Sequence, residues 1–170
     1  MTPLVRQTWS PRGHTPVLQH RTRAHQKVSV IAALCVPPTR DYVHLYFRLH
    51  ANRNITATEV VAFLRHLRHH LNGATVLLWD RFQAHRATKV QTFLTPASRI
   101  HPVFFPAYAP ELNPIEYAWG YLKRNPWANW APLDLDQLVV GTRRSSHALQ
   151  HRSDLLRSFI RHSPLSLRLN

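Results

Sequence analysis

Apolar positions along the chain follow two periodicities, and together they predict a mixed α/β domain. Four short apolar runs rich in β-branched or aromatic residues predict strands: 27–36, 42–50, 74–79 and 100–105. Three segments with apolar residues at helical spacing predict helices: Thr56 or Thr58 to Gly73, 86–94, and 113–124. The remainder, 133–165, also has helical periodicity, with a break expected at Ser145-Ser146. Antiparallel strands followed by strands joined through helices indicate a sheet flanked by helices.

Finer expectations concern the first residues and the buried faces of two helices. Residues 8–18 combine an aromatic residue, a Pro/Gly turn signal and a short apolar run, which predicts strand ends around a turn. The first helix should bury a stripe made of Val60, Phe63, Leu64, Leu67 and Leu71. The helix over 113–124 should bury Ile115, Trp119 and Leu122.

Charge is the unusual feature of the composition. The chain has 170 residues, 44% of them hydrophobic, which suits one globular domain with a real core. It contains 22 Lys and Arg against 8 Asp and Glu, a net charge of +14. Such an excess favours a polyanionic partner, most commonly nucleic acid. A basic but inert surface is the alternative, because charge alone defines neither a fold nor a site.

Cysteine usage and hydropathy exclude several classes of protein. The single cysteine, Cys35, rules out an internal disulfide and a cysteine-based zinc site, and its apolar surroundings predict a small core residue. Residues 1–19 lack the apolar segment of a signal peptide, and no run approaches the roughly 20 apolar residues that span a bilayer. We therefore expect a soluble, cytoplasmic protein without a membrane partner. His66, His69 and His70 share one helix face, which is more typical of a basic surface than of a zinc site.

Carboxylates are few, which narrows the search for acid chemistry or metal binding. They are Asp41, Glu59, Asp80, Glu111, Glu116, Asp134, Asp136 and Asp154. Asp80 directly follows the strand 74–79, at the carboxyl end where open α/β sheets place their ligands. Glu116 comes after 35 intervening residues, in the first turn of the helix that follows one more helix–strand unit. One crossover of that length returns the chain to a neighbouring strand, so the two side chains can converge.

Two carboxylates at such a point suit Mg²⁺, which prefers oxygen ligands and keeps waters that phosphate can replace. A pair of such ions can assist phosphodiester cleavage and strand transfer. Simpler interpretations exist. Asp80 is also consistent with an ordinary strand-to-loop residue, and Glu116 with a capping box that has Asn113 as N-cap and Pro114 as first helical residue. Spacing alone does not decide between these interpretations.

The residues around the pair resemble a known family. Segments 77–86 and 105–124, above all Pro110-Glu111-Leu112-Asn113-Pro114-Ile115-Glu116, are similar to the mariner-related DDE transposases of bacterial insertion sequences, the insertion sequence 630 family. Trp9 and Gly13 are similar to that family's Trp-x-x-x-Gly turn between its first and second strands. The resemblance covers roughly residues 4–125.

The resemblance implies a ribonuclease H-like fold and a D…D…E triad that binds two Mg²⁺ or Mn²⁺ ions and cuts transposon ends. Asp80 matches the second Asp and Glu116 the Glu. The implied partners are transposon-end and target DNA, bound by a homodimer in the bacterial cytoplasm. His85, Lys123 and Arg124 are candidate DNA contacts; a histidine that caps the next helix and a solvated lysine are the alternatives.

The family's first Asp precedes its Trp-x-x-x-Gly turn, whereas no acid here precedes Asp41, which follows the second strand. We therefore expect the first strand to be incomplete or missing, with 1–130 an N-terminally truncated catalytic core that lacks the family's helix-turn-helix, and 131–170 a C-terminal helical extension. With one of three ligands absent, the isolated chain is expected to be inactive or nearly so. Two functions stay open: a transposase catalytic domain within a longer polypeptide, or a non-catalytic DNA-binding or dimerising remnant. A host ribonuclease H-like nuclease is disfavoured by the Asn-Pro-Ile-Glu block.

Overall fold

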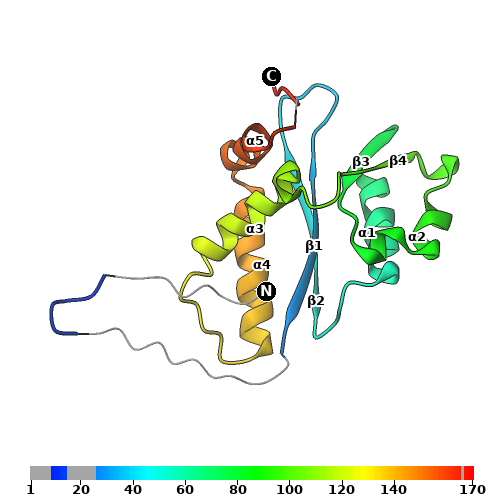
Figure 1. The fold of residues 1–170 in the computed structure, drawn as a ribbon. Helices are drawn as coiled ribbons and strands as arrows, with labels where there is room; N and C mark the ends of the chain where they lie inside the picture. Colours follow the sequence, from blue (N-terminus) through cyan, green and yellow to red (C-terminus); the bar gives the residue numbers. More distant parts are fainter. Residues whose placement is uncertain (1–8, 15–25, 166) are drawn as a thin grey trace.

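The computed structural model describes residues 9–14, 26–165 and 167–170 (Figure 1). Its helices and strands are β1 (Val28–Cys35), β2 (His44–Ala51), α1 (Ala57–His70), β3 (Thr75–Trp79), α2 (Thr88–Phe93), β4 (Ile100–Phe104), α3 (Pro114–Arg124), α4 (Leu135–Gln150) and α5 (Ser153–His162). Short 3-10 turns precede α2, β4 and α3: η1 (Gln83–Arg86), η2 (Pro96–Ser98) and η3 (Pro110–Leu112). The strands and helices expected between residues 27 and 124 are therefore present, with bounds shifted by one or two residues at most ends.

The strands form two pairs of opposite kind. β1 and β2 are antiparallel, in a register that runs from Val28 opposite Ala51 to Cys35 opposite His44. β3 and β4 are parallel, joined by the crossover through η1, α2 and η2. Within the described residues the two pairs are separate two-stranded sheets, and β1 is not hydrogen-bonded to β3. The expected mixed α/β architecture flanked by helices is confirmed, with its sheet divided into these two pairs.

The β1–β2 hairpin separates two hydrophobic cores because its side chains alternate between its faces. On one face Ala32, Leu34 and Val36 pack with α3, α4 and α5 in what we call the helical core. On the other face Ile31, Ala33 and Cys35 pack with α1, α2 and the β3–β4 pair in what we call the sheet core. Figure 1 shows the hairpin between these two groups of elements. The molecule is thus layered around β1 and β2.

Cys35 behaves as the small core residue expected from its apolar neighbours. It is partly buried against the sheet core, and burial raises the pKa of its thiol to about 12. A thiol with so high a pKa carries very little thiolate at neutral pH and is a poor nucleophile.

Helix α1 begins and packs as its sequence predicts. Thr56 is the N-cap: its side chain accepts a hydrogen bond from the Thr58 N–H, and its own N–H donates to Glu59 Oε2 at 2.9 Å, which completes a capping box. The buried stripe is confirmed for Val60, Phe63, Leu64 and Leu67, with Leu71 partly buried at the end. The chain then turns through Gly73, whose φ of +86° lies in the left-handed region that glycine tolerates best.

The expected break at Ser145-Ser146 is wrong, because α4 continues through both residues to Gln150. Ser146 is buried, with 2% of its surface exposed, in a helix that packs on β2 and β1. A small side chain suits such a contact, and serine inside a helix costs only a few tenths of a kcal/mol relative to alanine. The break falls instead at His151-Arg152, before α5 begins.

Helices α4 and α5 belong to the helical core rather than lying apart from it. Leu149, Leu156 and Phe159 are buried there together with Leu45 of β2 and Leu122 of α3. The boundary at residue 130 between core and extension stays a prediction, but these helices share a hydrophobic interior with the elements before it.

The turn expected near the start of the chain is present in residues 9–14. The His14 N–H donates to the Pro11 carbonyl at 3.0 Å, and Gly13 has a φ of +87°. The strand ends expected on both sides, and the incomplete or missing first strand, fall on residues 1–8 and 15–25, outside the described residues. None of the described helices has both the length and the hydrophobicity needed to cross a bilayer.

Candidate functional site

Asp80 lies where the parallel pair ends. The strands β3 and β4 end side by side, and the pairing continues one step further because the Phe105 N–H donates to the Trp79 carbonyl at 2.8 Å. Arg81 Nε then donates to the Phe105 carbonyl at 3.2 Å and ties the Asp80 loop to the loop that leads towards α3. No motif or spacing singles out Arg81, although adjacent ends of parallel strands place these two loops together.

His85 holds the Asp80 carboxylate. Its Nδ1 lies 2.8 Å from Asp80 Oδ1, and the same oxygen accepts a hydrogen bond from the Phe82 N–H at 3.0 Å. The imidazole stacks on Trp79, with ring centroids 4.5 Å apart and planes 13° from parallel. The His85 hydrogen bond, with a smaller contribution from the Phe82 N–H, lowers the pKa of Asp80 despite partial burial. Helix α2 has Ala87 as its N-cap and no side-chain cap, so His85 contacts Asp80 rather than capping that helix.

Glu116 occupies the first turn of α3. Asn113 is the N-cap, its side chain accepts from the Ile115 N–H at 3.4 Å, and Pro114 is at the start of the helix, as the sequence predicted. The Asn113 N–H, however, donates to the Pro110 carbonyl at 3.0 Å rather than to Glu116. The reciprocal bond of a capping box is therefore not made, and the Glu116 carboxylate remains available for another role.

The pKa of Glu116 depends on charged side chains close to it, Asp80 among them. Partial burial raises the pKa of Glu116, the Lys123 ammonium opposes that rise, and the negative charge of Asp80 adds to it. Asp80 and Glu116 thus interact across the 35 residues that separate them, and Lys123 lies on the same side of α3 as Glu116. The Arg124 side chain points elsewhere, because its guanidinium folds back over the backbone of Gly120.

The other carboxylates near this region do not complete a three-ligand group. Glu111 is exposed in η3, and its carbonyl accepts a hydrogen bond from the Tyr117 hydroxyl at 3.4 Å. Across the described parts of the chain, no three His, Cys, Asp or Glu side chains are arranged to hold a metal ion. The structure therefore brings together two carboxylates, one histidine and one lysine.

The remaining candidates from the sequence lie elsewhere. His66 and His70 contact each other, with ring centroids 4.5 Å apart, beside the ring of Tyr46 on β2. Burial, with nearby positive charges, lowers the pKa of His66. Trp127 is buried in the helical core, so its indole is not exposed to a partner.

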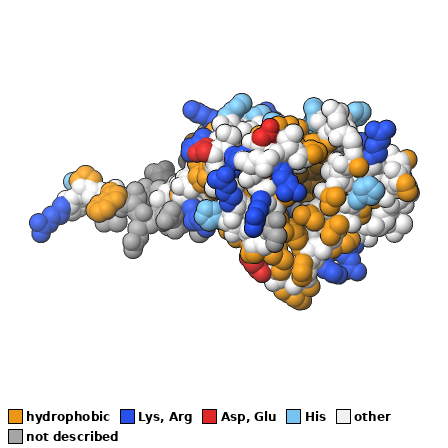
Figure 2. Space-filling view, turned by 90° about the horizontal axis from the view of Figure 1, so that it is seen from above, with side chains coloured by type: hydrophobic (Ala, Val, Ile, Leu, Met, Phe, Trp, Pro, Cys, Tyr) orange, Lys and Arg blue, Asp and Glu red, His pale blue; other side chains and the backbone are white. Residues whose placement is uncertain are grey.

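Basic side chains dominate the charged surface. On the face shown in Figure 2, Lys and Arg side chains are spread among hydrophobic ones and acidic side chains are few. Two arginines of the last helices have local partners: Arg157 donates to the Asp41 and Asn170 carbonyls, and Arg152 pairs with Asp154 at 3.4 Å. Arg143 and Arg144 are exposed on α4.

The helix stripe expected in α3 is shifted by one position. Ala118 and Leu122 are fully buried in the helical core, whereas Ile115 and Trp119 are only partly buried against it. Helix α3 packs on both α5 and β1, and the positions of such neighbours cannot be read from the spacing within one helix.

Comparison with solved structures shows a likeness of fold. A chain of the Mos1 strand transfer complex crystal structure matches with a TM-score of 0.55 and 17% identity, over 98% of this chain and 52% of that chain. This chain thus spans about half the length of its Mos1 match, and the likeness shows a ribonuclease H-like fold. A chain of the simian T-cell lymphotropic virus intasome in complex with PP2A regulatory subunit B56 gamma matches with a TM-score of 0.45 and 15% identity, over 96% of this chain and 63% of that chain.

No curated protein is significantly similar in sequence. The model of the DDE superfamily endonuclease family, however, matches residues 2–139, most of the chain and a span that includes both Asp80 and Glu116. The chain therefore belongs to the DDE superfamily of endonucleases.

Proposed function

We propose that Asp80 and Glu116 are two of the acidic ligands of a two-metal site for DNA cleavage and strand transfer, in a transposase related to the insertion sequence 630 family. The observation that carries the proposal is the electrostatic interaction of these two carboxylates, one at the end of β3 and one at the start of α3. Carboxylates that perturb each other at the carboxyl end of parallel strands, where open α/β sheets place their ligands, are candidates for a functional site.

The donor set suits a hard divalent cation such as Mg²⁺ or Mn²⁺, which prefers carboxylate oxygen. Two like charges that approach each other raise the pKa of one partner, as the effect of Asp80 on Glu116 illustrates, and a cation between them would offset that repulsion. Both hydrogen bonds to Asp80 that hold its side chain fall on Oδ1, so Oδ2 is the oxygen that can turn towards a ligand. When bound, the metal would supply Lewis-acid assistance to the attacking and leaving oxygens.

The chain's own side chains would orient this site. His85, fixed by its stack on Trp79, holds the Asp80 carboxylate in one orientation. Lys123 offsets the charge of Glu116 and, from the same helix face, would meet a DNA phosphate. Arg124, one residue further on, and His85 complete the proposed DNA contacts.

We further propose that the two carboxylates need a third, supplied by a segment other than the described residues, and that these 170 residues alone have little or no cleavage activity. Among the described residues, β1 pairs with β2 alone and β3 with β4 alone, and the edge that each of these strands leaves unpaired there supports this. A strand placed between them would reach the edge where Asp80 lies. Transposon-end and target DNA as partners, a homodimer, and action in the bacterial cytoplasm belong to the same proposal.

A non-catalytic DNA-binding or dimerising remnant is the second candidate. A net charge of +14 is sufficient for DNA binding without catalysis, and among the described residues two carboxylates rather than three approach each other at the site.

Reading the DNA upstream in all frames separates the two candidates. An open frame that encodes a helix-turn-helix and a strand ending in Asp supports the enzyme, and stop codons in every frame support the remnant. The biochemical test expresses the joined frames and measures cleavage of plasmid DNA that carries the flanking sequence, with Mg²⁺ or Mn²⁺. Asp80→Asn and Glu116→Gln should each abolish cleavage while DNA binding persists; undiminished cleavage by either variant would refute the assignment.

A further inference from the structure

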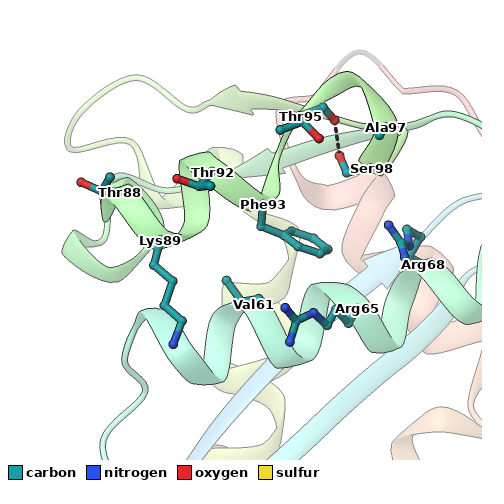
Figure 3. A pocket seen from close by; sticks show the side chains of 10 residues that line it. All are labelled: Val61, Arg65, Arg68, Thr88, Lys89, Thr92, Phe93, Thr95, Ala97 and Ser98. Atoms are coloured by element: carbon teal, nitrogen blue, oxygen red, sulfur yellow. Dashed lines mark hydrogen bonds between the residues drawn. The ribbon is translucent and has the colours of Figure 1, made fainter.

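A groove of about 550 Å³ lies between α1 and α2, away from the carboxylate pair. Figure 3 shows Phe93 pointing from α2 towards α1, with Arg65 and Arg68 on α1 and Lys89 reaching across from α2. The three cationic side chains are exposed, whereas Phe93 is partly buried. The groove therefore has an aromatic floor and a basic rim.

No carboxylate among the described residues that line the groove neutralises this rim. The residues that line the groove include three cations and no acid. Over residues 42–110 the sequence has only Glu59 and Asp80 as acids, and both are already engaged: Glu59 in the α1 capping box and Asp80 with His85. The positive potential of the groove is thus available to an anion from outside.

The cations are held in place rather than left to move freely. The Arg65 and Arg68 guanidinium carbons lie 5.7 and 5.9 Å from the centroid of the Phe93 ring, within the range of cation–π attraction. Lys89 Nζ donates to Thr58 Oγ1 at 2.9 Å. Side chains fixed in this way lose less conformational entropy when an anion binds.

The groove is long enough for more than one phosphate. Its lining runs from Val61 to Arg68 along α1 and from Thr88 to Ser98 on the α2 side. The part along α1 alone is roughly 10 Å long, at about 1.5 Å per residue. Successive phosphates of a nucleic-acid strand would fit along such a length, beside the hydroxyls of Thr88 and Thr92.

We propose that this groove binds the sugar–phosphate backbone of duplex DNA, as a second DNA-contacting surface distinct from the edge that carries Asp80 and Glu116. The inference rests on the proposed function in taking DNA as the partner. The new element is a location: the groove would hold a segment of the duplex that lies away from the cleaved bond. Arg65 and Arg68 are its principal phosphate contacts, and Lys89 is the third.

The test measures binding of a short fluorescent duplex of arbitrary sequence to the 170-residue chain by anisotropy, in EDTA and over a series of salt concentrations. Arg65→Gln/Arg68→Gln should weaken binding at least tenfold at moderate salt and reduce the slope of log affinity against log salt by about two, one for each lost phosphate contact. Arg143→Gln/Arg144→Gln on α4 removes the same charge from another surface and should have a clearly smaller effect.

Two further variants guard against a folding defect. Arg65→Lys/Arg68→Lys keeps the charge and should retain most of the affinity. Thr92→Glu leaves both arginines in place and should weaken binding by repulsion. The inference is overturned if the groove variant binds within twofold of the parent, or if the α4 variant loses as much affinity. Inorganic phosphate that competes at low millimolar concentration would also overturn it, since that result indicates a small-anion pocket.

Because the binding assay contains no metal, a result that overturns the groove proposal would leave the carboxylate assignment intact. Loss of cleavage by Asp80 or Glu116 variants would likewise say nothing about the groove.

Discussion

His85 Nδ1 lies 2.8 Å from Asp80 Oδ1, while the same imidazole stacks on Trp79 at a centroid distance of 4.5 Å. Trp79, the last residue of β3, thus positions the His85 imidazole, and that imidazole orients the carboxylate of Asp80. This contact turns an aspartate at the end of a strand into a side chain with a defined direction, which a metal ligand requires.

The first prediction concerns that contact. Since the His85 hydrogen bond is the main cause of the lowered pKa of Asp80, His85→Ala should raise that pKa towards its ordinary value. A ¹³C NMR titration of the Asp80 carboxyl in EDTA measures it directly. His101→Ala, which removes an exposed histidine from β4, should leave the titration unchanged. An unaltered Asp80 titration in the His85 variant would show that the contact is not made in solution.

Replacement of Glu116 separates a functional carboxylate from a structural one. A carboxyl whose pKa is raised in the folded state binds its proton more tightly there, so the folded chain loses stability as pH rises through that pKa. Glu116→Gln should therefore raise Tm at neutral pH in EDTA, on the order of 1–2 °C because the group is partly exposed, and change little in acid. A clear fall in Tm at neutral pH would instead support a capping role.

The capping box of α1 predicts the opposite dependence on pH. Hydrogen bonds from Thr56 lower the pKa of Glu59, so this carboxyl contributes stability above its unfolded pKa and loses it as pH falls through the lower folded pKa. Thr56→Ala should reduce the free energy of unfolding by about 1 kcal/mol at neutral pH and by less in acid. Urea denaturation measures this, with Thr92→Ala, at an exposed position in α2, as a near-neutral control. Equal losses for both threonines would contradict the cap.

The last two helices should be essential to folding. Leu156 of α5 is fully buried in the helical core with Leu45 of β2 and Leu122 of α3. Leu156→Ala should cost about 2–5 kcal/mol of unfolding free energy, whereas Leu133→Ala, at a position 51% exposed, should change it by no more than about 0.5 kcal/mol. Chemical denaturation compares the two. Similar small effects would mean that residues after 130 form a separate extension.

Much of the fold could be predicted because local signals decide it. The β-branched runs, the Thr56 cap and the Asn113-Pro114 start of α3 each specify an element through their nearest neighbours. The errors lie where a distant contact decides instead. Ser146 stays helical because α4 packs on β2, and α3 packs on both α5 and β1. Neither contact can be recognised from the hydrophobic periodicity of the helix that makes it.

The candidate site likewise has features that local signals predict and features that depend on more distant contacts. A strand end and a helix start nominate Asp80 and Glu116, but only the resemblance of the surrounding residues to a known family favours the metal interpretation over the simpler ones. The stack of His85 on Trp79 and the Arg81 bond to the Phe105 carbonyl could not be predicted, because both depend on how the chain turns immediately after β3. The basic groove likewise joins α1 to α2, and its residues are unremarkable in either helix alone.

The central claim is that Asp80 and Glu116 share a divalent metal ion, and substoichiometric Mn²⁺ tests it most directly. Paramagnetic broadening in the ¹⁵N spectrum of the 170-residue chain reports weak binding as well as tight binding. We predict that the amide signals around Asp80 and Glu116 broaden first, and that Asp80→Asn/Glu116→Gln abolishes this broadening. Broadening that persists in the double variant, or that centres on Asp134 and Asp136 in the parent chain, would contradict the claim.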